Sequence, residues 1–231
     1  MENSDVPPVN EIDIKQSDYY INRELSLIEF NRRVLAQAKD NTVPLLERLR
    51  YLSISSSNLD EFFEVRVSGL KQKIALGSTQ TGPDNMSSVE TLRDVSLRAH
   101  ELVAEQYRVL NEILLPQCEA EKIRFIRRTE WSESQAAWLR NYFKSEVQPM
   151  LSPMGLDPAH PFPRIINKGL NFIISLTGKD AFGRNSRLAV LQAPRSLPRL
   201  IQLPADETSS GPNDFVFLSS VIHAHADDIF Y

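Results

Sequence analysis

A chain of 231 residues is long enough for one or two domains. Its apolar content of 42% and its net charge of -4 are typical of a globular protein, and such mild acidity excludes recruitment of nucleic acid or of an anionic membrane through bulk electrostatics. The single cysteine, Cys118, excludes an intrachain disulfide and a cysteine-based metal site, and it fits a reducing compartment. We therefore expect a cytoplasmic protein with no nucleic-acid partner.

The N-terminal residues carry no sign of a targeting segment. Residues 1–17 are polar and acidic and lack the positive start and apolar run of a signal peptide, so they are predicted to form a flexible tail. No stretch approaches the roughly 18 consecutive apolar residues that a membrane helix needs. The sequence therefore predicts no transmembrane segment.

Residues 18–120 are predicted to form an N-terminal helical bundle, because their apolar residues recur at intervals of three and four. Ser26 and Glu29 have the spacing of a capping box and predict the start of a first helix. The apolar side of this helix is predicted to contain Leu27, Phe30, Val34 and Ala38.

Two more helix starts follow. Pro44 suits the first turn of a second helix. Asn58 has Glu61 three residues after it, which predicts that a third helix begins with Asn58 as its N-cap. Gly77 is the predicted stop of that helix.

The fourth helix is predicted to begin at Ser87, which again has a glutamate, Glu90, three residues later. Pro116 lies far along this helix. Because proline lacks a backbone N–H, Pro116 is predicted to kink the helix or to end it.

Beyond residue 121 helices and strands mix, and residues 121–231 are predicted to form a head domain. Ser132 with Gln135 predicts one helix start, and Ser219 is the predicted cap of a last helix. Because that helix reaches Tyr231 without a C-cap, we expect the domain to be truncated at its C-terminal end. The predicted strands are 123–127, 170–177, 188–192 and 215–218.

The predicted fold class is therefore α + α/β, a helical bundle followed by an incomplete mixed α/β head domain.

The side chain of Asn58 has two interpretations. As an N-cap, its oxygen accepts a backbone N–H and its NH2 group stays free to donate, for instance to a ring nitrogen of a nucleobase. A purely structural cap explains the same residue, because asparagine is common at N-caps for backbone reasons alone. The sequence pattern alone leaves both interpretations open.

Three arginines lie near Asn58, and a triphosphate ligand attracts cations. Charge pairs on solvated helix faces explain these arginines without a ligand, so none of them is taken as a site. The arginines are Arg48, Arg50 and Arg66, and their expected partners are Glu47, Glu61 and Glu64.

Several multi-residue motifs follow one another along the chain. They read YINRELS at 20–26, FNRRVL at 30–35, PLLERLR at 44–50, NLDEF at 58–62, LSP at 151–153 and DPAHPFP at 157–163. From Tyr20 onward the chain resembles the bacterial long-chain polyphosphate kinase family. Several separate multi-residue motifs in this order are far more specific than one short pattern.

The resemblance implies a kinase that reversibly transfers the γ-phosphate of ATP to the end of a polyphosphate chain. It implies a phosphohistidine located beyond residue 231, Mg²⁺ with ligands outside this chain, and homo-oligomers formed through the head domain. It also implies that Asn58 contacts ATP, and it places no catalytic residue here. We expect this fragment alone to be inactive. The alternative is a non-catalytic helical module that binds or regulates a partner.

Histidines in the chain have structural explanations. His160 lies among three prolines and is predicted to be a rigid loop residue rather than the nucleophile of the family. His223 and His225 with Asp227 and Asp228 suggest a zinc site, but residues two apart on a helix point to different sides. A solvated helix surface is the preferred interpretation. The sequence contains neither a P-loop nor a Rossmann phosphate-binding motif.

Overall fold

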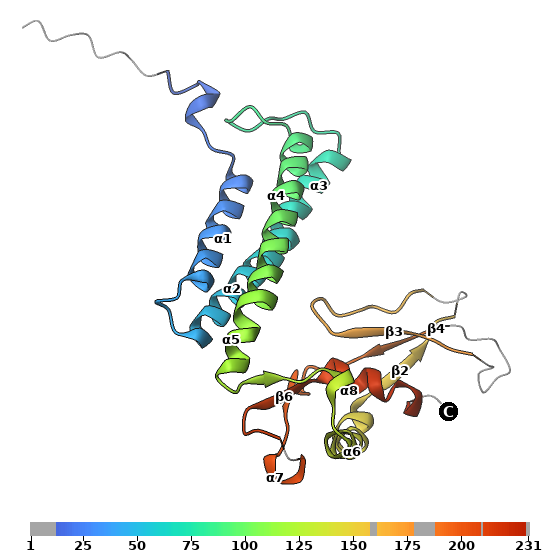
Figure 1. Cartoon of the computed structure of the whole chain (residues 1–231). Helices are drawn as coiled ribbons and strands as arrows, with labels where there is room; N and C mark the ends of the chain where they lie inside the picture. Colours follow the sequence, from blue (N-terminus) through green and yellow to red (C-terminus); the bar gives the residue numbers. More distant parts are fainter. Residues whose placement is uncertain (1–12, 158–160, 178–187, 209, 230–231) are drawn as a thin grey trace, which may run out of the picture. The chain divides into compact units, whose positions relative to one another are not determined.

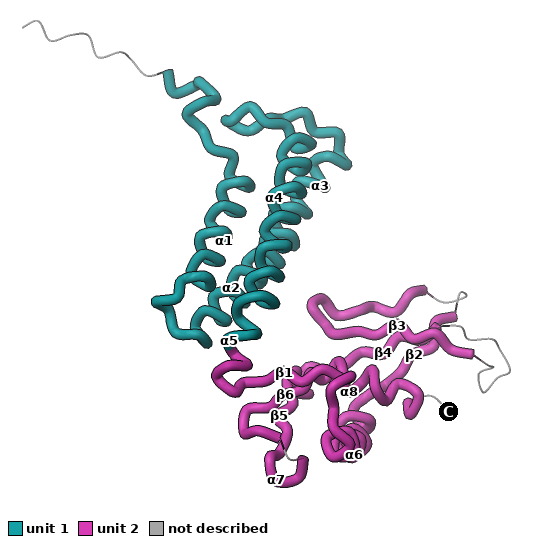
Figure 2. The backbone as a smooth tube through the Cα atoms, in the orientation of Figure 1, with its two compact units in different colours: residues 1–117 teal, residues 118–231 magenta. Residues whose placement is uncertain are grey.

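The structure is a computed structural model, and it describes residues 13–157, 161–177, 188–208 and 210–229. The chain divides into two compact units, Met1–Gln117 and Cys118–Tyr231, which Figure 2 colours separately. Most of the predicted tail, residues 1–12, lies outside the described residues, as do His160 and Tyr231.

Unit 1 is helical. Its long helices follow one another in an up-and-down arrangement in which α1 packs against α2 and α4 (Figure 1). The elements are the 3-10 helix η1 (Ser17–Tyr19), α1 (Arg23–Lys39), α2 (Leu45–Phe62), the π-helix η2 (Phe63–Val67), α3 (Ser68–Ala75), α4 (Ser88–Arg108), the π-helix η3 (Val109–Leu114) and α5 (Leu115–Ala120), which continues into unit 2.

Two predicted helix starts are wrong. The cap of α1 is Asn22, not Ser26, because the Asn22 Oδ1 accepts the N–H groups of Glu24 and Leu25, each at 3.1 Å. Asn58 is not an N-cap either, since it lies inside α2. Pro44 is the N-cap residue of α2 rather than its first helical residue.

Burial explains why α2 continues through Asn58. Leu52, Leu59 and Phe62 are each 7–8% exposed and lie on one stripe in the core of unit 1. A start at Asn58 would interrupt this stripe. The capping-box spacing of three residues also occurs between neighbours inside a helix, so the spacing cannot distinguish a start from an interior.

Other local predictions are confirmed. Ser87 caps α4, with its backbone N–H donating to Glu90 Oε2 at 2.9 Å. Gly77 follows α3 with φ of 67°, a left-handed conformation that glycine adopts without strain. Pro116 does not end the helical run, which reaches Ala120. The π-helical η3 precedes this proline.

Arg48 is a buried cation of unit 1, only 4% exposed. Its Nε donates to the backbone oxygen of Ala38 at 2.9 Å, and its Nη1 donates to Gln117 Oε1 at 2.7 Å. The predicted pairing on a solvated face is therefore wrong for Arg48. It is confirmed for Arg50, whose Nη1 lies 3.7 Å from Glu47 Oε2 and whose side chain is 72% exposed.

Unit 2 mixes short strands with helices, which confirms the predicted combination of a helical region and a mixed α/β region. Its strands are β1 (Arg124–Phe125), β2 (Ser152–Gly155), β3 (Asn171–Ser175), β4 (Leu188–Gln192), β5 (Leu200–Gln202) and β6 (Asp214–Phe217). Its helices are η4 (Arg128–Glu130), α6 (Glu133–Tyr142), the π-helix η5 (Phe143–Val147), η6 (Gln148–Met150), α7 (Ala205–Thr208), α8 (Leu218–Ala224) and η7 (Ala226–Asp228).

The strands form two small sheets. In the first, of order β1-β6-β5, β1 is parallel to β6 and β5 is antiparallel to it. In the second, of order β2-β4-β3, all pairs are antiparallel. β2 and β5 were not predicted. β2 contains Pro153, which an edge strand tolerates because one side of its backbone needs no ladder hydrogen bond, and β5 is only three residues long.

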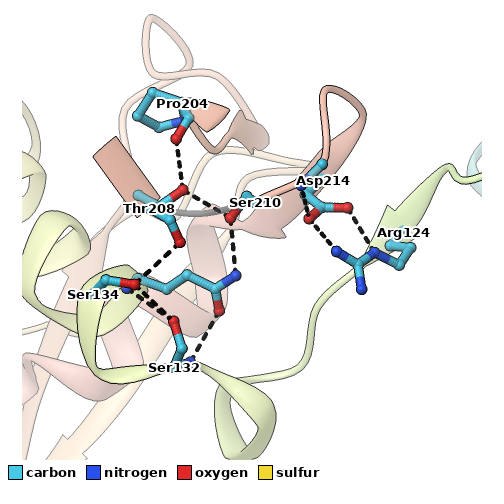
Figure 3. Close-up of polar contacts among 9 residues, drawn as sticks. Arg124, Ser132, Ser134, Pro204, Thr208, Ser210 and Asp214 are labelled. Atoms are coloured by element: carbon cyan, nitrogen blue, oxygen red, sulfur yellow. Dashed lines mark hydrogen bonds and ion pairs between the residues drawn. The ribbon is translucent and has the colours of Figure 1, made fainter. Parts of the chain in front are cut away.

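One of the two helix caps predicted in unit 2 is confirmed. Ser132 caps α6 as predicted, since its Oγ accepts the Gln135 N–H at 3.2 Å. Gln135 then donates its side-chain Nε2 to Ser210 Oγ at 2.9 Å, which ties α6 to the segment after α7 (Figure 3). Ser219 does not cap α8, which begins one residue earlier at Leu218 without a side-chain cap.

Asp214 anchors the first sheet. It is fully buried, opposite Arg124 in the β1–β6 register, and accepts hydrogen bonds from Arg124 Nε at 2.7 Å and from the Gly211 N–H at 2.6 Å (Figure 3). Burial by itself raises the pKa of the Asp214 carboxyl, but these hydrogen bonds outweigh burial, so the pKa lies below its usual value.

Among the described residues, no helix combines the length and the apolar character that crossing a lipid bilayer requires.

We predict that Arg48→Ala lowers the free energy of unfolding by about 2–3 kcal/mol, because it leaves the Ala38 carbonyl and Gln117 without their donor and removes the packed stem. Urea unfolding followed by far-ultraviolet circular dichroism measures this change. Arg50→Ala, on an exposed position of the same helix, is the matched control and should change the value by less than about 0.5 kcal/mol. Equal effects of the two variants would contradict the structure.

We also predict that unit 2 loses stability in acid because of Asp214. A carboxyl whose pKa is lowered by folding stabilises the fold above its unfolded pKa of about 3.9, and that stability is lost as the pH falls through the folded pKa. Fluorescence of the two tryptophans, Trp131 and Trp138, reports unfolding of unit 2 alone. Asp214→Asn should be less stable at pH 7 and should flatten the acid dependence. The exposed Asp206→Asn should retain it.

Candidate functional site

A pocket of about 380 Å³ lies between α1 and the continuous helix made by α2 and η2. This volume is in the range of small-molecule sites. Its apolar lining is Leu27, Ile28, Phe30, Leu59, Phe62 and Val65, and its polar lining is Asn31, Asn58, Glu61 and Arg66. The pocket therefore combines apolar walls with few polar groups.

The apolar lining has a buried part and an exposed part. Ile28, Leu59 and Phe62 belong to the core of unit 1, whereas Leu27 and Phe30 are 37% and 50% exposed. The prediction that Leu27 and Phe30 face inward is thus wrong. Two rows of apolar residues on α1 have the spacing of a buried helix face. The row that is buried contains Leu25, Ile28 and Leu35, not Leu27 and Phe30. The exposed row is left at the rim of the pocket.

Asn58 lines this pocket from the interior of α2 and is partly buried. Its Nδ2 lies 3.5 Å from Asn31 Oδ1 and donates to it. The predicted role of its side-chain oxygen as a cap is wrong, because the backbone N–H groups ahead of Asn58 already bond inside the helix. In the described part of the chain, no donor reaches the Asn58 Oδ1. The Asn58 Oδ1, which the sequence predicts to accept a backbone N–H, is therefore available to a ligand.

The charged lining consists of Glu61 and Arg66. Glu61 is exposed and Arg66 is half-buried in the π-helical η2. Within the described ranges, no salt bridge of at most 4.0 Å joins the Arg66 guanidinium to a carboxylate, so the predicted pair on a solvated face does not form. Arg66 therefore adds a positive charge to the pocket, which also contains the Glu61 carboxylate.

Histidines of the described segments do not line the pocket. His225 packs its ring on Phe143 with 4.9 Å between the centroids, and its Nδ1 lies 3.4 Å from Asp228 Oδ2. Burial lowers the pKa of His225 although the neighbouring Asp228 opposes this shift. The predicted solvated surface therefore describes the exposed His223 but not His225. His160, outside the described residues, has no structural account here.

No three histidine, cysteine, aspartate or glutamate side chains converge as a set of metal ligands in the described ranges. The pocket offers a single carboxylate, Glu61. The described residues therefore contain no cluster of carboxylates that would hold Mg²⁺ by protein side chains alone.

Two domains of one known protein family match most of this chain. Residues 20–126 match the polyphosphate kinase N-terminal domain, and residues 134–231 match the polyphosphate kinase middle domain. The chain belongs to the polyphosphate kinase family. The pocket lies entirely in the part that matches the N-terminal domain.

Curated polyphosphate kinases are similar over most of this chain. The polyphosphate kinase of Pseudomonas aeruginosa is 54% identical over 214 residues, which are 93% of this chain and 31% of that protein. That of Neisseria gonorrhoeae is 52% identical over 90% of this chain and 30% of its own length. The chain thus spans about a third of the length of the curated polyphosphate kinases it matches.

A solved structure has the same fold. The crystal structure of polyphosphate kinase from Porphyromonas gingivalis matches 90% of this chain and 31% of its own chain with a TM-score of 0.69 and 31% sequence identity. The helical unit followed by small mixed sheets is therefore an arrangement found in a polyphosphate kinase.

Proposed function

We propose that this chain is the N-terminal portion of a polyphosphate kinase and that the pocket between α1 and α2 holds the adenine of ATP through Asn58. The whole protein transfers the γ-phosphate of ATP reversibly to the end of a polyphosphate chain. Family membership supports the reaction, and the Asn58 carboxamide beside apolar walls, with only its Nδ2 bonded to Asn31 among the described residues, supports the position of the base.

The chemistry of the pocket matches that of a purine base. A base has flat apolar faces, which suit the side chains of Ile28, Leu59 and Phe62, and polar edges, which need a few hydrogen-bonding groups. Asn58 offers both an acceptor oxygen and an amide hydrogen. An asparagine carboxamide makes two hydrogen bonds to adenine, accepting from its amino group and donating to a ring nitrogen.

Arg66 suits the phosphates of the same ligand. A guanidinium binds phosphate oxygens through charge-assisted hydrogen bonds, and Arg66 lines the pocket from η2 without a salt bridge to a carboxylate of the described residues. In phosphoryl transfer the protein mainly positions the groups and stabilises their charge. We assign this unit to substrate binding.

The nucleophile of the reaction belongs elsewhere in this proposal. The family resemblance assigns the transfer to a phosphohistidine located beyond residue 231, and the described histidines do not line the pocket. Mg²⁺ helps to neutralise the phosphates when it is bound. We further propose a cytoplasmic homo-oligomer assembled through unit 2, on the family resemblance alone.

We predict that Asn58→Ala weakens ATP binding on the order of 10-fold, because it removes the donor and the acceptor at the edge of the base. Isothermal titration of the chain with ATP measures this affinity. Ser57→Ala, an exposed position of the same helix, is the matched control and should bind ATP as the wild type does. If the wild-type chain binds no ATP, the non-catalytic helical module becomes the better interpretation.

We predict that Arg66→Met weakens binding of ATP more than binding of adenosine, since only ATP carries phosphates for the guanidinium. The wild-type preference for ATP should also decrease as salt is added. Titrations with both ligands at two ionic strengths test this. Arg50→Met, which removes an exposed arginine outside the pocket, should leave the ratio of the two affinities unchanged. An equal loss for ATP and adenosine would mean that Arg66 does not contact phosphate.

A further inference from the structure

A buried hydrogen-bond network lies behind Asn58. Asn31 of α1 is 3% exposed, Ser55 of α2 is fully buried and Gln106 of α4 is 7% exposed. Asn31 Nδ2 donates to the backbone oxygen of Ser55 at 2.7 Å, and Gln106 Nε2 donates to Ser55 Oγ at 2.8 Å. The network thus joins residues of three helices, and only the contact between Asn31 and the Ser55 backbone oxygen holds the side chain that meets Asn58.

The bond to Ser55 sets which way the Asn31 carboxamide faces. If the Asn31 side chain turned over, its oxygen would oppose the Ser55 carbonyl oxygen at 2.7 Å, and two acceptors would repel each other in a buried site. Asn31 Oδ1 therefore faces Asn58. The Asn31 Oδ1 can only accept a hydrogen bond, so Asn58 must present its NH2 group to it. This agrees with the 3.5 Å contact between Asn58 Nδ2 and Asn31 Oδ1.

This contact fixes the orientation of the Asn58 carboxamide. One hydrogen of its NH2 is directed to Asn31, which leaves the second hydrogen and the Oδ1 for a ligand. If the Asn58 carboxamide turned over, its Oδ1 would oppose the Asn31 Oδ1. The donor and the acceptor that Asn58 presents therefore occupy defined positions.

Adenine and guanine present different hydrogen-bonding groups to the donor and the acceptor of Asn58. Adenine has an amino donor at position 6 beside ring-nitrogen acceptors, whereas guanine has a carbonyl acceptor at position 6 beside an N–H at position 1. A carboxamide in one orientation accepts from the adenine amino group and donates to its ring nitrogen. In the same pose, guanine places its carbonyl oxygen against the Asn58 Oδ1. A carboxamide that is free to turn over accommodates either base.

We propose that Asn31 is a positioning residue that makes the pocket select adenine over guanine by holding the Asn58 carboxamide in one orientation. The inference rests on the proposed nucleotide site. It assigns a role in base selection to a residue that does not itself need to contact the base.

The test compares the ratio of ATP to GTP affinities in two variants of the same buried network. Asn31→Leu keeps the volume and removes the acceptor that orients Asn58. Ser55→Ala removes the hydroxyl that accepts from Gln106 and donates to the Asn31 backbone oxygen at 3.5 Å, but it keeps the Ser55 backbone carbonyl that holds the Asn31 side chain. Both variants lower the melting temperature, so a merely structural role predicts equal effects on binding.

We expect the wild-type chain and Ser55→Ala to prefer ATP on the order of 10-fold in isothermal titrations, and Asn31→Leu to bring the ratio close to one. Asn31→Ser, whose side chain is too short to reach Asn58, provides the second variant should the leucine fail to fold. In nitrogen-15 spectra of the nucleotide-free chain, the Asn58 amide hydrogen that is bonded to Asn31 should have a chemical shift different from that of a solvated asparagine in the wild type and in Ser55→Ala. In the Asn31 variants this chemical shift should move to the solvated value.

Each other outcome has a definite meaning. Equal loss of base preference in the Asn31 and Ser55 variants, or an unchanged preference in the Asn31 variants, overturns the inference. If Asn58→Ala weakens ATP binding while the Asn31 variants keep the preference, the nucleotide site stands and only the role of Asn31 is wrong. If Asn58→Ala binds ATP as the wild type does, or if the wild type binds neither nucleotide, the proposed site itself is wrong.

Discussion

The hydrogen bond from the Asn31 side chain to the Ser55 carbonyl joins α1 to α2 where the pocket lies between these helices. It is short, at 2.7 Å, and buried, so breaking it leaves a polar group without a partner in an apolar surrounding. The contact holds the two pocket walls together and also sets the direction of the Asn31 oxygen. The packed helical core thereby restricts the orientation of the Asn58 side chain.

The continuity of α2 into η2 supplies the other wall. Asn58 belongs to α2, whereas Val65 and Arg66 belong to the π-helical turn that follows without interruption. A π-helical turn contains one extra residue, so the side chains after it are rotated relative to those of a regular helix. Such turns are frequent at functional sites. Here the turn contributes the cation of the pocket.

The two units differ in the polar groups that they contain. Unit 1 contains a pocket with the polarity of a nucleotide-base site, and unit 2 contains small sheets in which Asp214 is buried against Arg124. The chain spans about a third of the relatives it matches. Under the proposed function, substrate binding belongs to unit 1 and the transfer step belongs to the part of the relatives outside this span.

The sequence by itself determined the family, the division into helical and mixed regions, and caps such as Ser87 and Ser132, because motifs and caps depend on neighbouring residues. The motif with Asn58 predicted an N-cap, which is wrong, and its predicted contact with ATP stays a prediction. Only tertiary structure decided that Asn58 lies within a helix, that Arg48 is buried and that Asn31 faces Asn58. The spacing of residues along a helix is the same at a start, in a core and on a surface, so packing between helices must select among them.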